Sequence, residues 1–413
     1  MEEIQSVTES EKSGHLGGKL KVVLLCDEWG SSKGGLSTFN KELASHLAKR
    51  SDLEVSCFLP EVSLCDKNAA IKHNVTLIKA ESIPGNREPL VNLQHWPTEL
   101  PSPDVIISHS RKFGCAAYCI KREYPSCKWA HFVHVDCEQM GKNKVGDNEM
   151  SANNIKDKDE LSLCEKADVV VAVGPQLFDR YIRSLPSKRK KVKVFYPGLN
   201  NEFRNLPEKN VENEKFHIYI FGRCSSEDFE LKGFDLVADA VGILGEDYNV
   251  HVVGVPEGEE KNTLQHIVAT TKLKKSQLFV WCYCKNREEM KEMMCEADLV
   301  VMPSRAEAFG LIGLEALSAG VPLLVSADSG LGMTLKKLNF GDTCVVKSEP
   351  SEEWAKRIEL LKQKERSQRL FEVNHIRNQY EEKYKWEDQC SRLVELLWEL
   401  KRYDDRETKD TTN

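Results

Sequence analysis

The 413-residue sequence lacks several features that would assign its class at once. No window approaches the run of about 18 apolar residues that a membrane helix needs, and the polar first 18 residues contain no apolar core of a signal peptide. The 58 basic and 65 acidic residues are interspersed, with a net charge of -7, so the balance indicates no nucleic-acid partner. We therefore expect a cytoplasmic protein without a transmembrane segment.

Two motifs with a defined chemistry are also missing. The 14 cysteines are scattered, and Cys282 and Cys284 form a C-x-C with no second pair at zinc spacing. Reduced thiols that pack as small hydrophobes are the favoured interpretation. The loop Asp27–Gly35, after the first apolar run, contains no G-x-G-x-x-G. A dinucleotide oxidoreductase is disfavoured for that reason.

What the sequence does contain is an alternation of apolar runs and helical patterns. The first run, Lys21–Trp29, precedes a glycine loop and a helical pattern at Ser37–Arg50. A second series of the same kind starts after the polar, proline-containing segment Pro197–Lys215, which is interpreted as a linker. Strands that alternate with helices predict parallel, doubly wound sheets. We expect an α/β fold of two Rossmann-like domains facing each other across a cleft, where ligands bind at the carboxyl ends of the strands.

The domain boundaries follow from shifts in composition. Residues 1–18 are expected to form a disordered tail, residues 19–205 the first domain and residues 206–383 the second domain. The helix expected at 384–403 has its apolar residues in one stripe, so we expect it to pack back on the first domain. Residues 404–413 are polar and are expected to be a second disordered tail.

Two acids stand out near the end of the second series. Glu307 lies in a polar loop, and Glu315 follows eight residues later inside a short helix that is otherwise uncharged. Because its neighbours are apolar, we expect Glu315 to be half buried and to need a partner, either a ligand or a neighbouring segment. The amides of Ala308–Leu311 begin the helix and can hold an anion or a hydroxyl group.

The string PSRAEAFGLIGLEALSAGVPLLVS, Pro303–Ser326, resembles the E-x7-E signature of retaining GT-B glycosyltransferases of family 4. The resemblance extends over most of the chain, from about Lys21 to about Leu400. Three further landmarks carry it: a glycine loop at Gly34–Phe39, a strand end at His131–Asp136 and a G-R…K-G motif at Phe221–Gly233. The spacer inside the last motif is similar to that of glycosyltransferase-like domains of multidomain animal proteins.

This resemblance implies a retaining hexosyltransferase that takes a nucleotide-diphosphate sugar, most commonly a UDP-sugar, and an unknown acceptor. The diphosphate is a good leaving group that needs its charge neutralised; Arg223 can contact it bidentately and Lys232 as a point charge. The family pattern places Glu307 and His134 at the sugar. It places Glu315 at the ribose hydroxyls.

The remaining implied contacts come from the backbone. Gly34 and Gly35 would lie under the donor phosphates, and the amides at Phe309, Gly310 and Leu311 would hold sugar hydroxyls or phosphate oxygens. The sequence offers no convincing D-x-D pair of carboxylates for Mg²⁺ or Mn²⁺. We expect a reaction that needs no metal and no cofactor besides the nucleotide sugar.

The roles of the two histidines in the strand end His131–Asp136 are separated by their spacing. Alternation along the strand puts His131 and His134 on opposite faces, so one of them is expected in the core, and we favour His134 as the ligand-binding one. The acceptor would be read by loops of the first domain such as Glu81–Trp96 and Met140–Lys156. These loops carry no motif that names it.

Two departures from the family pattern favour an alternative function. Ala308 stands where glycine is usual, and a methyl group there could narrow the donor pocket or resist a positive φ. Cys282 replaces a common glycine near the expected nucleobase. A non-catalytic nucleotide-sugar sensor or scaffold is therefore the second hypothesis, and an epimerase or phosphorylase on the same fold is the third.

Overall fold

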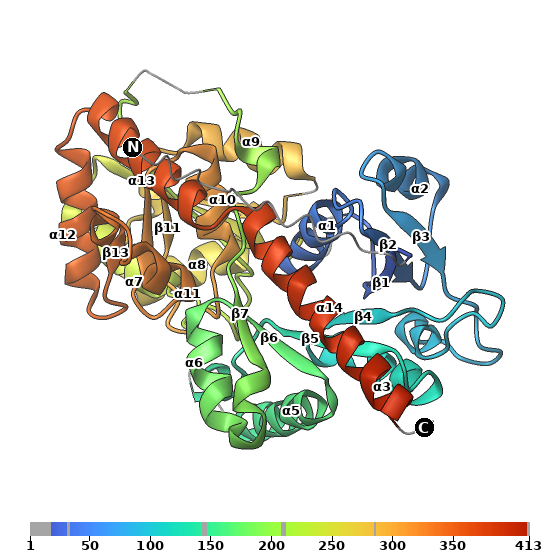
Figure 1. Cartoon of the computed structure of the whole chain (residues 1–413). Helices are drawn as coiled ribbons and strands as arrows, with labels where there is room; N and C mark the ends of the chain where they lie inside the picture. The colour runs from blue at the N-terminus through green and yellow to red at the C-terminus, as the bar shows by residue number, and fades with distance from the viewer. Residues whose placement is uncertain (1–17, 31–33, 143–146, 208–211, 285, 411–413) are drawn as a thin grey trace, which may run out of the picture.

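The structure, a computed structural model, describes residues 18–30, 34–142, 147–207, 212–284 and 286–410. It contains two parallel sheets in two halves of the molecule (Figure 1). The first sheet has seven strands in the order β3-β2-β1-β4-β5-β6-β7, and the second has six in the order β10-β9-β8-β11-β12-β13. Both orders reverse next to their first strand, which is where α/β sheets bind ligands. The predicted fold is confirmed.

The strands of the first sheet are β1 (Leu20–Leu25), β2 (Leu53–Leu59), β3 (Thr76–Lys79), β4 (Val105–His109), β5 (Lys128–Val133), β6 (Val169–Val173) and β7 (Val192–Phe195). The helices of this half are α1 (Gly35–Leu47), α2 (Leu64–Ile71), α3 (Ser110–Glu123), α4 (Cys137–Lys142), α5 (Asp147–Lys166) and α6 (Pro175–Ser184), with short 3-10 helices η1 (Pro89–Gln94) and η2 (Pro186–Lys191). The central strands are buried along their whole length, as in β6, where all five residues are buried. Helices on both faces explain why these strands read as unbroken apolar runs.

The strands of the second sheet are β8 (Phe216–Phe221), β9 (Tyr248–Val255), β10 (Leu278–Cys282), β11 (Leu299–Met302), β12 (Leu323–Ser326) and β13 (Val345–Val346). Its helices are α7 (Phe234–Leu244), α8 (Glu260–Thr270), α9 (Arg287–Glu296), α10 (Leu311–Ala319), α11 (Gly330–Leu335), α12 (Ser351–Lys362) and α13 (Arg366–Lys383). Three more 3-10 helices complete the chain: η3 (Asn201–Phe203), η4 (Lys275–Gln277) and η5 (Gly341–Cys344). The predicted division between residues 205 and 206 falls after η3 and before β8.

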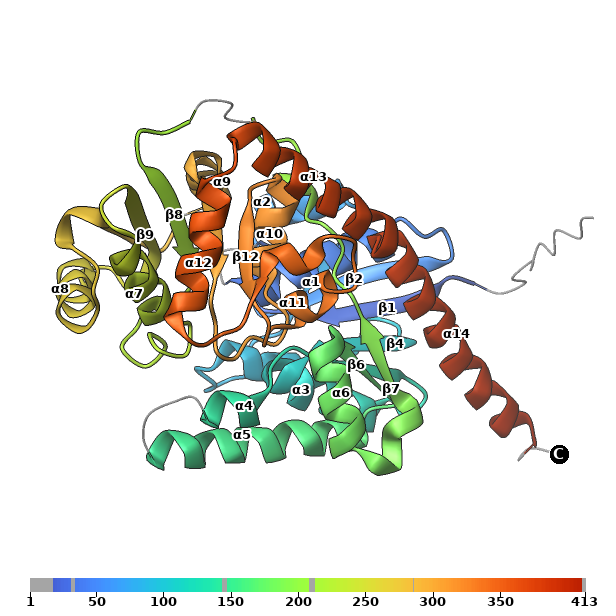
Figure 2. The ribbon, with the colours of Figure 1, turned by 90° about the vertical axis from the view of Figure 1, so that its left-hand side faces the viewer.

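The last helix, α14 (Trp386–Asp410), leaves the second half and runs along the first (Figure 2). The ring of Trp386 stacks on His46 of α1 at 5.2 Å, and Trp398 Nε1 donates to Asp52 at 3.1 Å. The predicted crossing back to the first domain is confirmed. Helix α14 continues to Asp410, so the described part of the predicted tail, residues 404–410, is assigned as helix, in keeping with its helix-favouring charged residues. Residues 411–413 and the predicted tail 1–17 lie outside the described residues.

The segment expected as an open linker, Pro197–Lys215, is packed where it is described. Phe203 is fully buried, and Asn200 N donates to Ser318 Oγ of α10 at 2.9 Å. Tyr380 Oη donates to the Pro197 carbonyl at 2.7 Å. Buried apolar residues and backbone hydrogen bonds both fix the segment, so its polar composition hid a packed connection.

A second correction concerns the expected loop Met140–Lys156. Its described residues, Met140–Lys142 and Asp147–Lys156, belong to α4 and α5. The buried positions of α5 include Asn153, Glu160 and Cys164, so the helix has no apolar stripe by which periodicity could have found it. The other expected loop, Glu81–Trp96, is irregular apart from η1.

Candidate active site

A cavity of about 400 Å³ opens between the carboxyl ends of the two sheets. All but two of the sequence-predicted site residues line it: Gly35, His134, Arg223, Lys232, Glu307, Phe309, Gly310 and Leu311. The exceptions are Gly34 and Glu315. The structure therefore brings residues from both domains, far apart in the chain, to one place.

The segment predicted as a glycine loop, Gly34–Phe39, is helical from Gly35 onward, and this start of α1 reaches across the cleft. Gly34 has a φ of 104° and precedes α1, a conformation that favours glycine. A Cβ on Gly35 would lie 3.0 Å from Cδ1 of Leu311 in the second domain. Gly174, after β6, approaches Phe309 in the same way, since its Cβ would lie 2.5 Å from the phenyl ring. Small residues on the first domain thus allow the two domains to touch beside the cavity.

His134 stands on the first-domain wall, just past the end of β5. Its Nε2 lies 2.9 Å from Nδ1 of His109, at the end of β4. Nε2 of His109 lies 2.8 Å from Oδ1 of Asn40 in α1. Burial lowers the pKa of His134 to about 3 and lowers the pKa of His109 well below its ordinary value. Both rings are therefore neutral at physiological pH.

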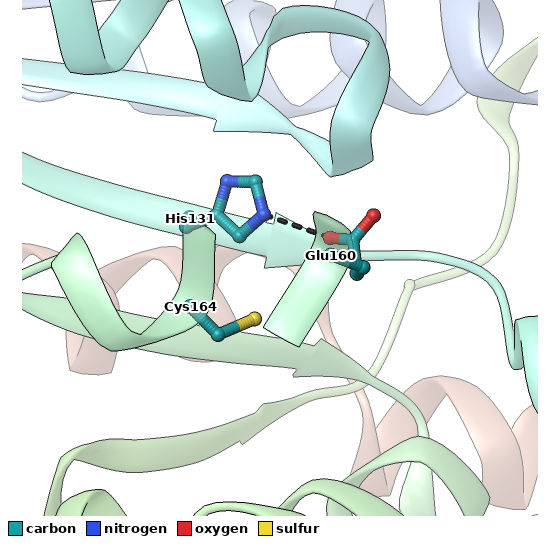
Figure 3. Close-up of side chains that lie close together, drawn as sticks. All are labelled: His131, Glu160 and Cys164. Carbon is teal, nitrogen blue, oxygen red and sulfur yellow. Dashed lines mark hydrogen bonds and ion pairs between the residues drawn. The ribbon is translucent and has the colours of Figure 1, made fainter. Parts of the chain in front are cut away.

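His131 points to the other face of the sheet, as the alternation along β5 predicts, and is fully buried. Its Nε2 hydrogen bonds with Glu160 at 2.8 Å (Figure 3). Its Nδ1 lies 2.8 Å from Ser108 Oγ. His131, Glu160 and Cys164 offer ligand atoms within 4.8 Å of one another. However, the histidine and carboxylate already satisfy each other, and burial raises the pKa of the Cys164 thiol far above its ordinary value. We interpret this group as a hydrogen-bonded core and assign no metal to it.

The second-domain wall is charged. Lys232 Nζ lies 2.7 Å from Oε2 of Glu307, and Ser304 Oγ donates to the same oxygen at 3.3 Å. The side chain of Arg223 is 70% exposed and lies 3.8 Å from Asp228. One cation of the G-R…K-G motif is therefore paired with the acid expected at the sugar, and the other faces solvent.

The loop after β11 has the conformation of an anion-binding helix start. Gly310 has a φ of 103° and precedes α10, and a Cβ there would lie 2.4 Å from Cε of Met302. Ala308 is not among the described non-glycine residues with a positive φ. Alanine in place of the usual glycine therefore causes no backbone strain here. Ala308 lines a smaller cavity, whose wall also includes His134 and Glu307. It does not line the cavity of about 400 Å³.

Glu315 is buried, as expected, and has found a partner in a neighbouring segment. Its Oε1 accepts from Nη2 of Arg287 in α9 at 2.6 Å, and Arg287 also lies 3.4 Å from Glu202. Burial raises the pKa of the Glu315 carboxyl. The sequence left open whether the partner of Glu315 is a ligand or a neighbouring segment of the protein. The structure shows a protein partner, Arg287, and a bound ribose would have to share the carboxylate with it.

Sequence reasoning missed Asn40, His109 and Arg287. A histidine at the carboxyl end of a buried strand is the signal that pointed to His134, and His109 shows the same signal at the end of β4. Cys282, suspected near the nucleobase, hydrogen bonds with Glu260 at 2.8 Å and does not line the large cavity. Arg287 had no local signal, because the pairing depends on how α9 and α10 are placed.

Two Rossmann-like halves, a cleft between them and a basic phosphate-type motif on the second half define a GT-B architecture. A family model described as "Family 4 Glycosyltransferase in conflict systems" matches residues 23–393. The chain belongs to the family 4 glycosyltransferases.

Relatives and solved structures agree with this assignment. The D-inositol 3-phosphate glycosyltransferase of Corynebacterium urealyticum is 25% identical over an alignment of 320 residues, which covers 72% of each chain. An uncharacterized glycosyltransferase of Methanocaldococcus jannaschii is 27% identical over 55% of this chain, and the matched part spans 59% of that relative. Sucrose-phosphate synthase from Thermosynechococcus elongatus has the same fold, with a TM-score of 0.71 at 17% identity over 92% of this chain and 99% of that one. Anabaena HepE, solved in complex with UDP and glucose, has a TM-score of 0.68 at 14% identity, over 92% of this chain and 100% of the HepE chain.

Among the described residues, no helix combines the length and apolar character needed to cross a bilayer.

Proposed function

We propose that this protein is a retaining glycosyltransferase that moves a hexose from a nucleotide-diphosphate donor, a UDP-sugar, to an acceptor. The observation that carries the proposal is the contact between Lys232 and Glu307 at the cavity. A basic residue of the phosphate motif and an acid of the E-x7-E signature meet at one point there. The UDP and glucose complex of Anabaena HepE, a protein with the same fold, supports the choice of donor.

In this proposal the donor diphosphate lies against Arg223, Lys232 and the start of α10. As the bond between the anomeric carbon and the phosphate oxygen breaks, the electron pair leaves with the diphosphate, and the two cations stabilise the growing charge. Lys232 exchanges Glu307 for phosphate, which leaves the Glu307 carboxylate for the sugar. The acceptor oxygen forms its bond on the face that the diphosphate leaves, and its proton passes to the departing phosphate.

The same charges are the reason to propose that the reaction needs no metal ion. Two side-chain cations and the amides at the start of α10 supply the neutralisation that Mg²⁺ would otherwise provide. We also place the protein in the cytoplasm, since its 14 cysteines are unpaired, which suits a reducing compartment.

The test is to incubate the protein with a panel of nucleotide sugars, with and without EDTA, and to measure release of the nucleotide diphosphate. Release from one donor that is insensitive to EDTA supports the proposal. Glu307→Gln should bind free UDP nearly as the wild type does but release UDP from the donor much more slowly, because its contact is made to the sugar. Binding of a donor without release in any condition would favour the sensor hypothesis instead.

A further inference from the structure

The hydrogen bonds behind His134 determine what its ring can do, and their direction can be deduced. In Asn40 the amide nitrogen lies 4.0 Å from Sγ of Cys57, and the amide oxygen lies 2.8 Å from Nε2 of His109. A carbonyl oxygen can only accept, so Nε2 of His109 must carry the proton. A neutral His109 then has a lone pair on Nδ1.

That lone pair fixes the next ring. Nε2 of His134 lies 2.9 Å from Nδ1 of His109, so His134 must donate from Nε2. A neutral His134 consequently keeps no proton on Nδ1. Among the described residues none hydrogen bonds with this Nδ1, and His134 lines both cavities at the cleft.

The surroundings keep both rings neutral and fixed in orientation. His109 is fully buried, and His134 packs edge-on against Phe39 at 4.9 Å. The titratable groups around the pair are His131 on β5 and Lys232 and Glu307 across the cavity, with Asp136 following β5. Lys232 pairs with Glu307, and Arg180 pairs with Asp136 at 2.9 Å, so each of these carboxylates already has a cation of its own.

We infer that His109 and Asn40 are positioning residues that hold His134 in the neutral Nε2-protonated form, so that its Nδ1 accepts a hydrogen bond from a hydroxyl group of the donor sugar. This assignment rests on the proposed function for its ligand. It makes a specific demand on the donor, because the contacted position must bear a group that donates. A histidine that donated to the sugar would make the opposite demand.

The tautomer can be measured without any activity. In protein labelled with ¹⁵N-histidine, the signals of His134 are assigned by their loss in His134→Gln. We expect a pyrrole-type Nε2 and a pyridine-type Nδ1 at pH 7. In His109→Phe and Asn40→Leu, the preference of His134 for the Nε2-protonated tautomer should be lost. Ser108→Ala, which disturbs the same strand one residue away on its other face, should leave it unchanged.

The demand on the donor is tested with deoxy and fluoro analogues at each sugar hydroxyl. Fluorine cannot donate a hydrogen bond. At the position that contacts Nδ1 of His134, the deoxy and the fluoro analogue should therefore both have a kcat/KM about tenfold below that of the parent donor, the effect of one well-placed hydrogen bond. In His109→Phe, with folding verified by circular dichroism, the loss caused by these analogues should shrink.

A wild-type His134 with a pyrrole-type Nδ1 would overturn the assignment. The assignment would also be overturned if, at every position where the deoxy analogue is a poor donor, the fluoro analogue were used as well as the parent sugar. If no nucleotide sugar is bound or consumed, the proposed transfer activity is refuted, while the ring spectra still decide whether His109 and Asn40 set the tautomer.

Discussion

The two walls of the cleft hold their polar groups in opposite ways. On the first domain, His134 and His109 are neutral, enclosed by aromatic rings and joined in a chain that ends at Asn40. On the second domain, Arg223 and Lys232 keep their charges at the surface, with side chains 70% and 28% exposed. The first wall is organised without a ligand, whereas in the proposed function the second exchanges partners when a diphosphate binds.

This contrast fits the chemistry of a nucleotide sugar. Sugar hydroxyls are neutral, and they are discriminated best by buried hydrogen-bonding groups of fixed direction. Phosphates carry charge that grows during bond cleavage, and charged side chains that are still partly hydrated meet them at little cost. Changes to the second wall should therefore affect turnover most, and changes to the first wall should appear in stability and in selectivity.

The largest effect is expected from removing the cations of the second wall. Lys232→Ala and Arg223→Ala should each lower donor affinity and turnover by roughly ten- to a hundredfold, since a hydrogen bond to a charged group is worth about 1.5–3 kcal/mol. Calorimetric titration with UDP and nucleotide-release kinetics measure this. Lys190→Ala, an exposed lysine of η2 in the first domain, is the matched control and should behave as wild type. Unchanged donor affinity in both cleft variants would place the diphosphate elsewhere.

Glu315→Gln should lower stability and so separates the two acids of the E-x7-E signature. Glu315 is 5% exposed and bonded to Arg287, so the variant leaves that guanidinium short of a partner and should lose about 1–3 kcal/mol of unfolding free energy. Glu288→Gln, in an exposed pair with Lys291, should lose less than about 1 kcal/mol. Urea denaturation gives both values.

The same variant also tests the ribose contact. If Glu315 accepts from the ribose, Glu315→Gln lowers affinity for free UDP as well as for the donor. Glu307→Gln leaves free UDP binding nearly intact. A stable Glu315→Gln variant with unchanged UDP affinity would contradict both roles.

On the first wall, the expected signature is a dependence of stability on pH. Burial lowers the pKa of His109 well below its ordinary value, so in acid the unfolded chain binds a proton that the folded protein does not. The resulting stability is complete above the unfolded pKa of about 6.5 and is lost as the pH falls below it, by up to about 1.4 kcal/mol per pH unit for one proton. His109→Phe should make the fall between pH 7 and pH 5 shallower. His95→Phe, at an exposed position, should not.

These residues also mark how far sequence alone could reach. Strands such as β1 and β6, the approach of Gly35 to the cavity, and the meeting of Arg223, Lys232 and Glu307 there could be predicted, because local pattern and motif spacing encode them. Pairings between distant segments could not. Asn40 and His109 are 69 residues apart, and their contact depends on the placement of α1 against β4.

Helix α5 and the connecting segment were misjudged for a related reason. The buried positions of α5 are partly polar, and the Glu160 carboxylate is satisfied by His131 and by the backbone N–H of Arg111, both from elsewhere in the fold. Periodicity detects apolar faces, so a helix that buries hydrogen-bonded groups looks like a polar loop. Phe203 shows the same problem in a linker-like sequence.

The smallest effect concerns Ala308, the departure from the family pattern that raised doubt about activity. Its backbone needs no positive φ, and it lines the smaller cavity beside His134 but not the large one. Ala308→Gly should therefore leave donor affinity within about twofold and cost about 0.4–1 kcal/mol of stability, because glycine adds freedom to the unfolded chain. Thermal unfolding and donor titration on the same samples measure both quantities. A marked gain in donor affinity would mean that the methyl group narrows the site. An unchanged affinity would show that alanine is compatible with the donor pocket, so that this departure from the family pattern gives no support to the sensor hypothesis.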